Sequence, residues 1–369
     1  MSEHASDRAA ALMAGPRGRA LLMEFAGESA RAVADEWGWH PFTSAVVDAS
    51  YHLDPEKGTP ALSLFGPGAK QTDDTVVAPE EVARQLAGLD LIDVTAMLLR
   101  DLVTHSVEEA AYWQKPRGSD VLAATWPVRA ALSRVADHIA ATELTSWWFS
   151  DLDSTGQQCV WWCDDTAPIV TGSIRDLLRA HREDRIEWEA RARRSRPADP
   201  TAAWSGEWWS PPPSSIWRTT RTLYDASPAG LWWVEDSMGE SNAWTRSVEI
   251  ENPVRVAEIA NAEAWAELCL RFPLSVSAQV RHDWYRTTGR VGAWVIPDWA
   301  AVSEHYDAVH LQVGAYLSAA GRAIPVDDDT ASVIAGWNPD ETYWLGSSPE
   351  PTGARVAWTR NSGEAWRRA

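Results

Sequence analysis

Apolar residues in the first 145 positions recur mostly at intervals of three and four, which is the spacing of one face of an α-helix. Proline precedes several of these stretches, as it often does at the first turn of a helix. The predicted helices cover residues 16–37, 79–88, 94–103 and 127–139. Residues 40–78 are rich in proline and glycine, and there we expect short strands at residues 44–47 and 61–65.

After residue 145 the pattern changes to the alternation of apolar and polar residues that is typical of β-strands. Strands are predicted at residues 146–150, 157–163, 216–223, 231–235, 243–250, 255–259, 307–313, 332–335 and 342–345. A long helix is predicted over residues 173–195, with shorter ones after the capping residues Asn261 and Asp298 and at residues 315–320. The predicted fold class is α+β, with a helical N-terminal part followed by a mainly antiparallel, tryptophan-rich β-sheet with short helices.

Proline-rich stretches around residues 197–200 and 211–213 interrupt these patterns and mark a boundary. The length of 369 residues predicts two domains, and the alternative is a single large one. We expect a mostly helical domain at residues 1–145, tryptophan-rich strands and a long helix at 146–200 that join the halves, an α+β sheet domain at 201–346, and a polar tail at 347–369.

The chain contains 24 tryptophans, and half of them lie between residues 147 and 244. Adjacent pairs occur at Trp147-Trp148, Trp161-Trp162, Trp208-Trp209 and Trp232-Trp233. An indole has a large flat face, and one core rarely accommodates so many of them, so we expect some to line a ligand pocket. We assign Trp208 and Trp232 to the walls of this pocket.

Acidic residues outnumber basic ones, 52 to 33, which gives a formal net charge of −19. A surface of this charge repels nucleic acid and anionic membranes, so we expect neither as a partner. The three cysteines are too few for a disulfide framework, and no apolar stretch resembles a signal peptide or a membrane span. We therefore expect a cytoplasmic protein. The spacing of Cys, His and Asp predicts no metal site, and nothing in the sequence indicates a particular cofactor.

Residues 282–290 hold the densest group of chemically active side chains. Within this stretch, His282 and Asp283 are candidates for acid–base catalysis. The ligand-binding candidates are Tyr285, Arg286, Thr287 and Arg290. Arginine binds carboxylate or phosphate through a planar fork of donors, and threonine hydroxyls add further donors. We interpret the stretch as a binding loop, and the alternative is a polar connection that its aromatic residues anchor to the core.

His310 is a second catalytic candidate, because histidine transfers protons near neutral pH. In the predicted strand at residues 307–313, His310 and Gln312 point to the same face, so Gln312 is a further binding candidate. Either Asp283 or Asp307 would orient a catalytic imidazole. The alternative is a histidine on the solvent face of an antiparallel sheet.

The strand predicted at residues 216–223 contains Arg218 and Arg221, and Glu249-Ile250-Glu251 follows further along the chain. This set resembles, in outline, the early strand arginine and the Glu-x-Glu of ADP-ribosyltransferases. The resemblance covers a few scattered residues and implies an ADP-ribosyltransferase-like enzyme as a minor alternative.

The sequence lacks the glycine-rich motifs of dinucleotide-binding and phosphate-loop proteins, and it lacks Gly-x-Ser-x-Gly and His-Glu-x-x-His. Our leading hypothesis is a cytoplasmic small-molecule enzyme or binder with a tryptophan-lined pocket. It would act, for example as a transferase, on a nucleotide-like, phosphorylated or polyhydroxylated ligand. The alternative is a non-catalytic or immunity-type protein that uses an acidic, tryptophan-rich surface to bind a protein partner or a second copy of itself.

Overall fold

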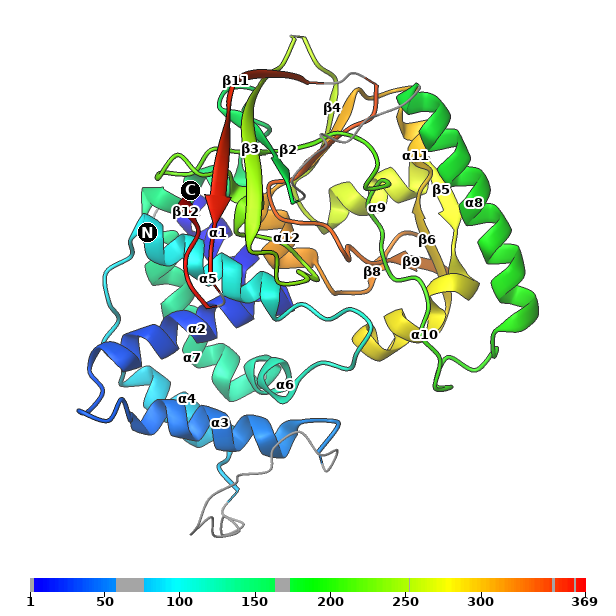
Figure 1. Cartoon of the computed structure of the whole chain (residues 1–369). Coiled ribbons are helices and arrows are strands. Elements are labelled where there is room, and N and C mark those ends of the chain that lie inside the picture. Colours follow the sequence, from blue (N-terminus) through cyan, green and yellow to red (C-terminus); the bar gives the residue numbers. More distant parts are fainter. Residues whose placement is uncertain (1–2, 58–75, 163–172, 252, 347–348, 362) are drawn as a thin grey trace.

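The computed structural model describes residues 3–57, 76–162, 173–251, 253–346, 349–361 and 363–369. Helices gather in the N-terminal part of the chain and most strands follow it, which confirms the α+β prediction (Figure 1). None of the described helices combines the length and the apolar composition that crossing a membrane requires.

The N-terminal helices pack on one another through their apolar faces. They are α1 (Glu3–Ala14), α2 (Pro16–Ala32), α3 (Pro41–Leu53), α4 (Pro79–Ala87), α5 (Ala96–Glu108), α6 (Gly118–Ala124) and α7 (Trp126–Ala140). Helix α7 packs against α1 and α4, and α3 packs against α6. The predicted face of α2 is buried, with no exposed surface at Leu21, Leu22 and Phe25. Helical periodicity therefore located most of these elements to within a few residues.

The strand expected at residues 44–47 is wrong, because this segment belongs to α3. Pro41 lies in the first turn, and the ring of His40 accepts a hydrogen bond from the Phe42 backbone N–H, so the helix has a defined start. Its buried residues, Phe42, Ala45 and Ala49, follow the spacing of one helix face. The other expected strand, at residues 61–65, lies outside the described residues.

The larger sheet has eight strands in the order β12-β11-β3-β1-β2-β10-β7-β4. The strands are β1 (Gln157–Trp161), β2 (Arg218–Arg221), β3 (Asn242–Glu249), β4 (Val256–Ile259), β7 (Ala308–Leu311), β10 (Thr342–Trp344), β11 (Glu350–Thr359) and β12 (Arg367–Arg368). All neighbours pair antiparallel except β4 and β7, which are parallel. The sequence pattern predicted no strand after residue 346, yet β11 extends the sheet beside β3.

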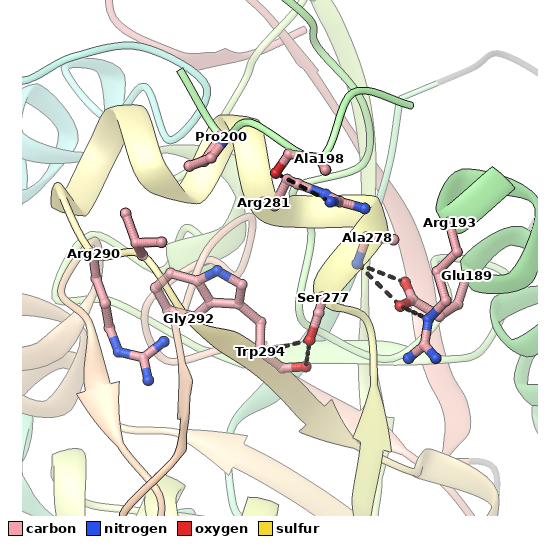
Figure 2. Close-up of a pocket in the computed structure, with 11 residues that line it drawn as sticks. Glu189, Arg193, Ala198, Pro200, Ser277, Ala278, Arg281, Arg290, Gly292 and Trp294 are labelled. Atoms are coloured by element: carbon pink, nitrogen blue, oxygen red, sulfur yellow. Dashed lines mark hydrogen bonds and ion pairs between the residues drawn. The ribbon is translucent and has the colours of Figure 1, made fainter. Parts of the chain in front are cut away.

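A second, smaller sheet has the order β5-β6-β9-β8. Its strands are β5 (Pro273–Ser275), β6 (Ala293–Pro297), β9 (Thr330–Ser332) and β8 (Ile324–Pro325). Beside it lie α8 (Ile174–Ser195) and α10 (Ser277–Thr288), which pack on each other (Figure 1). Glu189 of α8 accepts hydrogen bonds from the backbone at the start of α10 (Figure 2).

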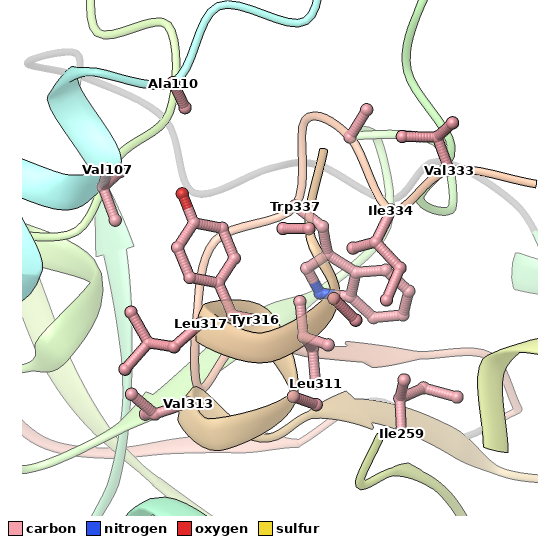
Figure 3. Close-up of a cluster of buried hydrophobic side chains, with 14 of the residues drawn as sticks. Val107, Ala110, Ile259, Leu311, Val313, Tyr316, Leu317, Val333, Ile334 and Trp337 are labelled. Atoms are coloured by element: carbon pink, nitrogen blue, oxygen red, sulfur yellow. The ribbon is translucent and has the colours of Figure 1, made fainter. Parts of the chain in front are cut away.

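Three further short α-helices lie in the described part of the chain, and two of them have the predicted N-caps. They are α9 (Ala262–Arg271), α11 (Trp299–Val302) and α12 (Val313–Ala319). The Asn261 side chain accepts a hydrogen bond from the third residue of its helix, and that of Asp298 accepts hydrogen bonds from the second and third residues of its own. Helix α12 packs against α1 and α2, so it joins the C-terminal part to the helical part. Around it Val107, Tyr316, Leu317 and Trp337 belong to one buried cluster (Figure 3).

Two predicted tryptophan-rich strands are wrong. Residues 143–149 form a 3₁₀ helix, η1 (Glu143–Phe149), and η2 (Ala229–Leu231) leads into the segment expected as a strand at 231–235. Successive side chains of a 3₁₀ helix diverge by about 120°, so adjacent tryptophans point to different surroundings. Trp148 is accordingly buried, whereas Trp147 is only half-buried.

Candidate functional site

A pocket of about 340 Å³ lies between α5, η1 and the segment that follows β2. Its aromatic and apolar walls come from Leu99, Trp147, Trp148, Tyr224 and Trp233. Two cationic side chains, Arg100 and Arg221, also line it. We call it the aromatic pocket.

The three tryptophans of the aromatic pocket hold one another in place. The rings of Trp147 and Trp233 are nearly parallel, at 11°, with their centroids 6.1 Å apart. Trp148 meets Trp147 almost at a right angle, with centroids 6.4 Å apart. The indole N–H of Trp233 donates to the Arg100 carbonyl at 3.1 Å. Two of the three rings are buried, so the half-buried Trp147 offers the accessible indole surface.

The two arginines differ in how far their charge is compensated. Arg100 donates to Asp101 and Asp225 at 2.9 and 2.8 Å, and its guanidinium lies 3.6 Å from the centre of the Trp232 ring. The Arg221 guanidinium lies 4.4 Å from the centre of the Trp147 ring. Its Nη2 is buried and has no hydrogen-bond partner among the described residues. Arg221 therefore lines the pocket with a guanidinium that carries one buried, unsatisfied donor.

Arg221 is one end of a row of four alternating charges, which we call the charged row. Asp340 accepts from both the backbone N–H and the Nε of Arg221, at 2.8 and 2.9 Å. His310 Nε2 lies 3.6 Å from Asp340, and His310 Nδ1 is hydrogen-bonded to Glu258 at 2.7 Å. The four residues lie on or beside the neighbouring strands β2, β10, β7 and β4, so the pairing of the sheet aligns them.

The charged row favours the protonated form of His310. Burial alone would lower the pKa of this imidazole, but Asp340 and Glu258 outweigh burial and raise the pKa to about 9. The imidazolium is therefore the main form at neutral pH, and the row carries two positive and two negative charges. Asp340 adopts a left-handed backbone conformation, with φ of 61°, which costs on the order of 1 kcal/mol outside glycine. Such strain is common where a structure must hold a side chain in one position.

Gln312, the binding candidate near His310, is at the N-cap of α12 and is buried. Its amide donates to Asp151 at 3.2 Å, and the backbone N–H of the next residue, Leu152, donates to Glu258 at 2.8 Å. The segment at residues 151–152 thus contacts Gln312 directly and is linked to His310 only through Glu258, at the end of the row away from Arg221.

The stretch at residues 282–290 is not a loop, so that interpretation is wrong. Residues up to Thr288 belong to α10, and Gly289, in the left-handed conformation, ends the helix. Asp283 is fully buried and accepts from Ser205 and Gly206, at 3.0 and 2.8 Å, and also from Arg286. The helix packs on α8 and β6 rather than forming a cover over the His310 strand.

Most polar candidates on α10 are bound within the protein. Arg286 donates to the carbonyls of Trp113 and Trp204, both at 2.7 Å, in addition to its contact with Asp283. The Thr287 hydroxyl donates to backbone carbonyls, and Tyr285 is half-buried. These groups join α10 to the segments around residues 113 and 204. They leave Arg286 little capacity to bind a ligand.

His282 has no exposed surface, and neither ring nitrogen has a hydrogen-bond partner among the described residues. Burial, reinforced by the nearby Arg281, lowers its pKa, so the ring is neutral at pH 7. Arg290 lies in a second pocket, where its guanidinium is 4.8 Å from the centre of the Trp294 ring (Figure 2).

Trp208 and Trp232 lie next to other tryptophans rather than among the residues that line the aromatic pocket. Trp208 is buried and stacks on Trp209 with centroids 4.7 Å apart. The Trp232 ring packs against the Arg100 guanidinium, and its indole N–H donates to Ser227 at 2.8 Å. Trp233, next to Trp232, does line the pocket, whereas Trp209, next to Trp208, does not.

The residues behind the resemblance to ADP-ribosyltransferases separate in the sheet, where β1 lies between β2 with Arg221 and β3 with Glu249. No family model matches this chain, and no curated protein or solved structure is significantly similar to it. The function must therefore be inferred from the geometry of the sites.

Proposed function

We propose that this chain binds a small, flat, negatively charged organic molecule in the aromatic pocket. A nucleotide-like or phosphorylated aromatic ligand has the required chemistry. Its ring would contact Trp147, and its anionic group would accept from Arg221. The two described cysteines are free, buried thiols, which fits the reducing cytoplasm as the place where the ligand is encountered.

The observation that carries this proposal is the unsatisfied Nη2 of Arg221. A buried donor without a partner costs roughly 1–3 kcal/mol, so this guanidinium has unused capacity to donate to an anion. Asp340 holds the Nε side of the guanidinium, and the Trp147 ring supports its face, so the side chain is already positioned before a ligand arrives. Preorganisation of this kind increases affinity because little freedom is lost on binding.

The site supports binding better than general-base catalysis. His310 lies behind Asp340 and Arg221 in the charged row, and it retains its proton at neutral pH. Glu143 also lines the pocket, but 88% of its side-chain surface is exposed and it has only a 3.8 Å ion pair with Arg8. A transferase reaction is a narrower form of the proposal and would require the ligand to supply its own reactive group.

The proposal is tested by filling the pocket without removing any of its contacts. Ala96 lines the pocket at the start of α5, and its neighbour Met97 is 58% exposed and does not line it. We expect nucleotides or aromatic phosphates to raise the melting temperature of the wild-type chain and change its tryptophan fluorescence. Ala96→Phe should weaken both responses, whereas the matched control Met97→Phe should retain them in full.

A second variant tests the role of charge. Arg221→Gln should lower the affinity for an anionic ligand by about tenfold or more, because a charge-assisted hydrogen bond contributes about 1.5–3 kcal/mol. An uncharged analogue with the same ring should bind both forms alike. Equal responses of Ala96→Phe and the wild type, or no response to any flat anion in the series, would overturn the proposal.

A further inference from the structure

A second pocket, of about 380 Å³, lies between α8, α10 and the turn before β6 (Figure 2). It shares no lining residue with the aromatic pocket. Three arginines from separate segments line it: Arg193 of α8, Arg281 of α10, and Arg290 of the turn. We call it the arginine pocket.

Glu189 is the one acidic side chain among the residues that line the arginine pocket, and its carboxylate already accepts several hydrogen bonds. Its carboxylate accepts from the backbone N–H groups of Ala278 and Gln279 at 2.9–3.1 Å. It also accepts from Arg193 Nε at 2.9 Å (Figure 2). Glu189 therefore caps α10 and neutralises Arg193, but it compensates neither of the other two guanidinium groups.

Arg281 and Arg290 donate only to uncharged groups in the part of the chain that the structure describes. Arg281 Nη1 reaches the Ala198 carbonyl at 3.4 Å, and its Nε is buried without a partner. Arg290 donates to the carbonyls of Ala293 and Asp329, both at 2.9 Å. A carbonyl partner orients a guanidinium without cancelling its charge. The lining side chains alone therefore leave two net positive charges, in a chain whose overall charge is −19. Asp327, which does not line the pocket, interacts electrostatically with Arg290.

We propose that the arginine pocket binds the phosphate group of a small phosphate monoester. A phosphate monoester carries a charge of about −1.5 to −2 at pH 7, which matches the two guanidinium groups that no lining carboxylate pairs with. A carboxylate carries a single charge and would leave one of them unpaired. The planar donor fork of arginine suits phosphate oxygens, and the pocket is larger than a phosphate group, so the organic part of the ester also has room.

The experiment uses inorganic phosphate as a compact probe that has no ring for the aromatic pocket. Its affinity for the full-length chain is measured by calorimetry at constant ionic strength, with acetate as the singly charged comparison. We expect phosphate to bind more tightly than acetate. Arg281→Gln should lower the affinity for phosphate by about tenfold, and Arg281→Lys should retain most of it.

Arg194→Gln is the matched control, because Arg194 is an exposed arginine of α8 next to Arg193 and does not line the pocket. This variant should bind phosphate like the wild type. If Arg281→Gln folds poorly, as shown by its melting temperature without ligand, Arg290→Gln provides the same test. Equal phosphate affinity in the glutamine variants and the wild type, or equal affinity for phosphate and acetate, would overturn the proposal. Ala96→Phe should leave phosphate binding unchanged, so this result is independent of the aromatic pocket.

Discussion

Glu235 carries a carboxyl group that is buried in the protein. It is 9% exposed, and its Oε1 accepts from the Tyr112 hydroxyl at 2.6 Å. Its backbone N–H donates to the Asn338 side chain at 2.9 Å. Burial is the main cause that raises the pKa of Glu235 to about 7, and the hydrogen bond from Tyr112 opposes this only in part. The residue joins the segment after α5 to the loop before β10.

The raised pKa of Glu235 predicts how stability changes with pH. The folded state holds the proton up to about pH 7, whereas the unfolded carboxyl loses it near pH 4.5, so the stabilisation is complete below 4.5 and is lost as pH rises through 7. The loss amounts to roughly 3 kcal/mol. Glu235→Gln cannot ionise and still accepts from Tyr112, so we expect it to be more stable than the wild type at pH 8 and about equally stable at pH 4.5. Urea denaturation at both pH values measures the difference in unfolding free energy between the variant and the wild type. The same difference at pH 4.5 and pH 8 would contradict the prediction.

Local sequence patterns cannot predict contacts between side chains that are far apart in the sequence. Asp340 binds Arg221 from 119 positions away, and only the strand order β2-β10-β7-β4 brings Glu258 and His310 into the same row. The sequence did indicate which residue types matter: arginines beside tryptophans, and a histidine on a strand. It could not indicate which tryptophan of an adjacent pair faces a pocket, because that choice depends on neighbours that are distant in sequence.

At the scale of elements, prediction succeeded where a segment buries one apolar face. It failed where a segment buries polar side chains or where adjacent aromatic side chains have different surroundings. Helices α2, α4, α7 and α8 and strands β1, β3 and β4 agree with their patterns to within a few residues. The segment at 282–290 was misjudged because α10 is rich in polar residues that bind inside the protein, so it shows no clear apolar face. The pair Trp147-Trp148 lies in a segment predicted as a strand, but a 3₁₀ helix also gives the two rings different surroundings.

The contact between the helical part and α12 requires a glycine at position 15. A Cβ placed on Gly15 would lie 2.4 Å from the backbone carbonyl oxygen of Leu317, a separation that real contacts do not allow. Gly15→Ala must therefore shift α12 away from α1 and α2, and we expect a loss of roughly 1–3 kcal/mol in the free energy of unfolding. Gly27, inside α2, has room for a Cβ at 3.6 Å from the Arg31 side chain.

The matched variant Gly27→Ala should be stabilising, by about 0.5–1 kcal/mol, because alanine loses less backbone entropy than glycine in a helix. Chemical denaturation of the two variants beside the wild type gives both values. Opposite signs would support the tight contact at Gly15. A Gly15→Ala variant as stable as the wild type would show that α12 adjusts without cost.

At the scale of the molecule, one hydrophobic cluster runs through both parts of the chain. It includes Leu22 and Phe25 of α2, Leu317 of α12 and Trp265 of α9 (the α12 region is shown in Figure 3). Specific polar contacts reinforce the junction: Arg100 of α5 pairs with Asp225, and the indole N–H of Trp233 donates to the Arg100 carbonyl. Neither part can expose its share of this cluster to water without losing the burial that stabilises it.

This shared core predicts that the helical and sheet parts unfold together, although the sequence pattern suggested separate domains. Circular dichroism at 222 nm reports mainly the helices, whereas only Trp37, Trp39, Trp113 and Trp126 of the 24 tryptophans lie in the first 145 residues, so fluorescence reports mainly the rest. We expect both signals to give one midpoint in urea, and Gly15→Ala should shift both by the same amount. Two separate midpoints would mean that each part has enough buried surface to fold alone, and the contact of α12 with α1 and α2 would then be an interface between two domains.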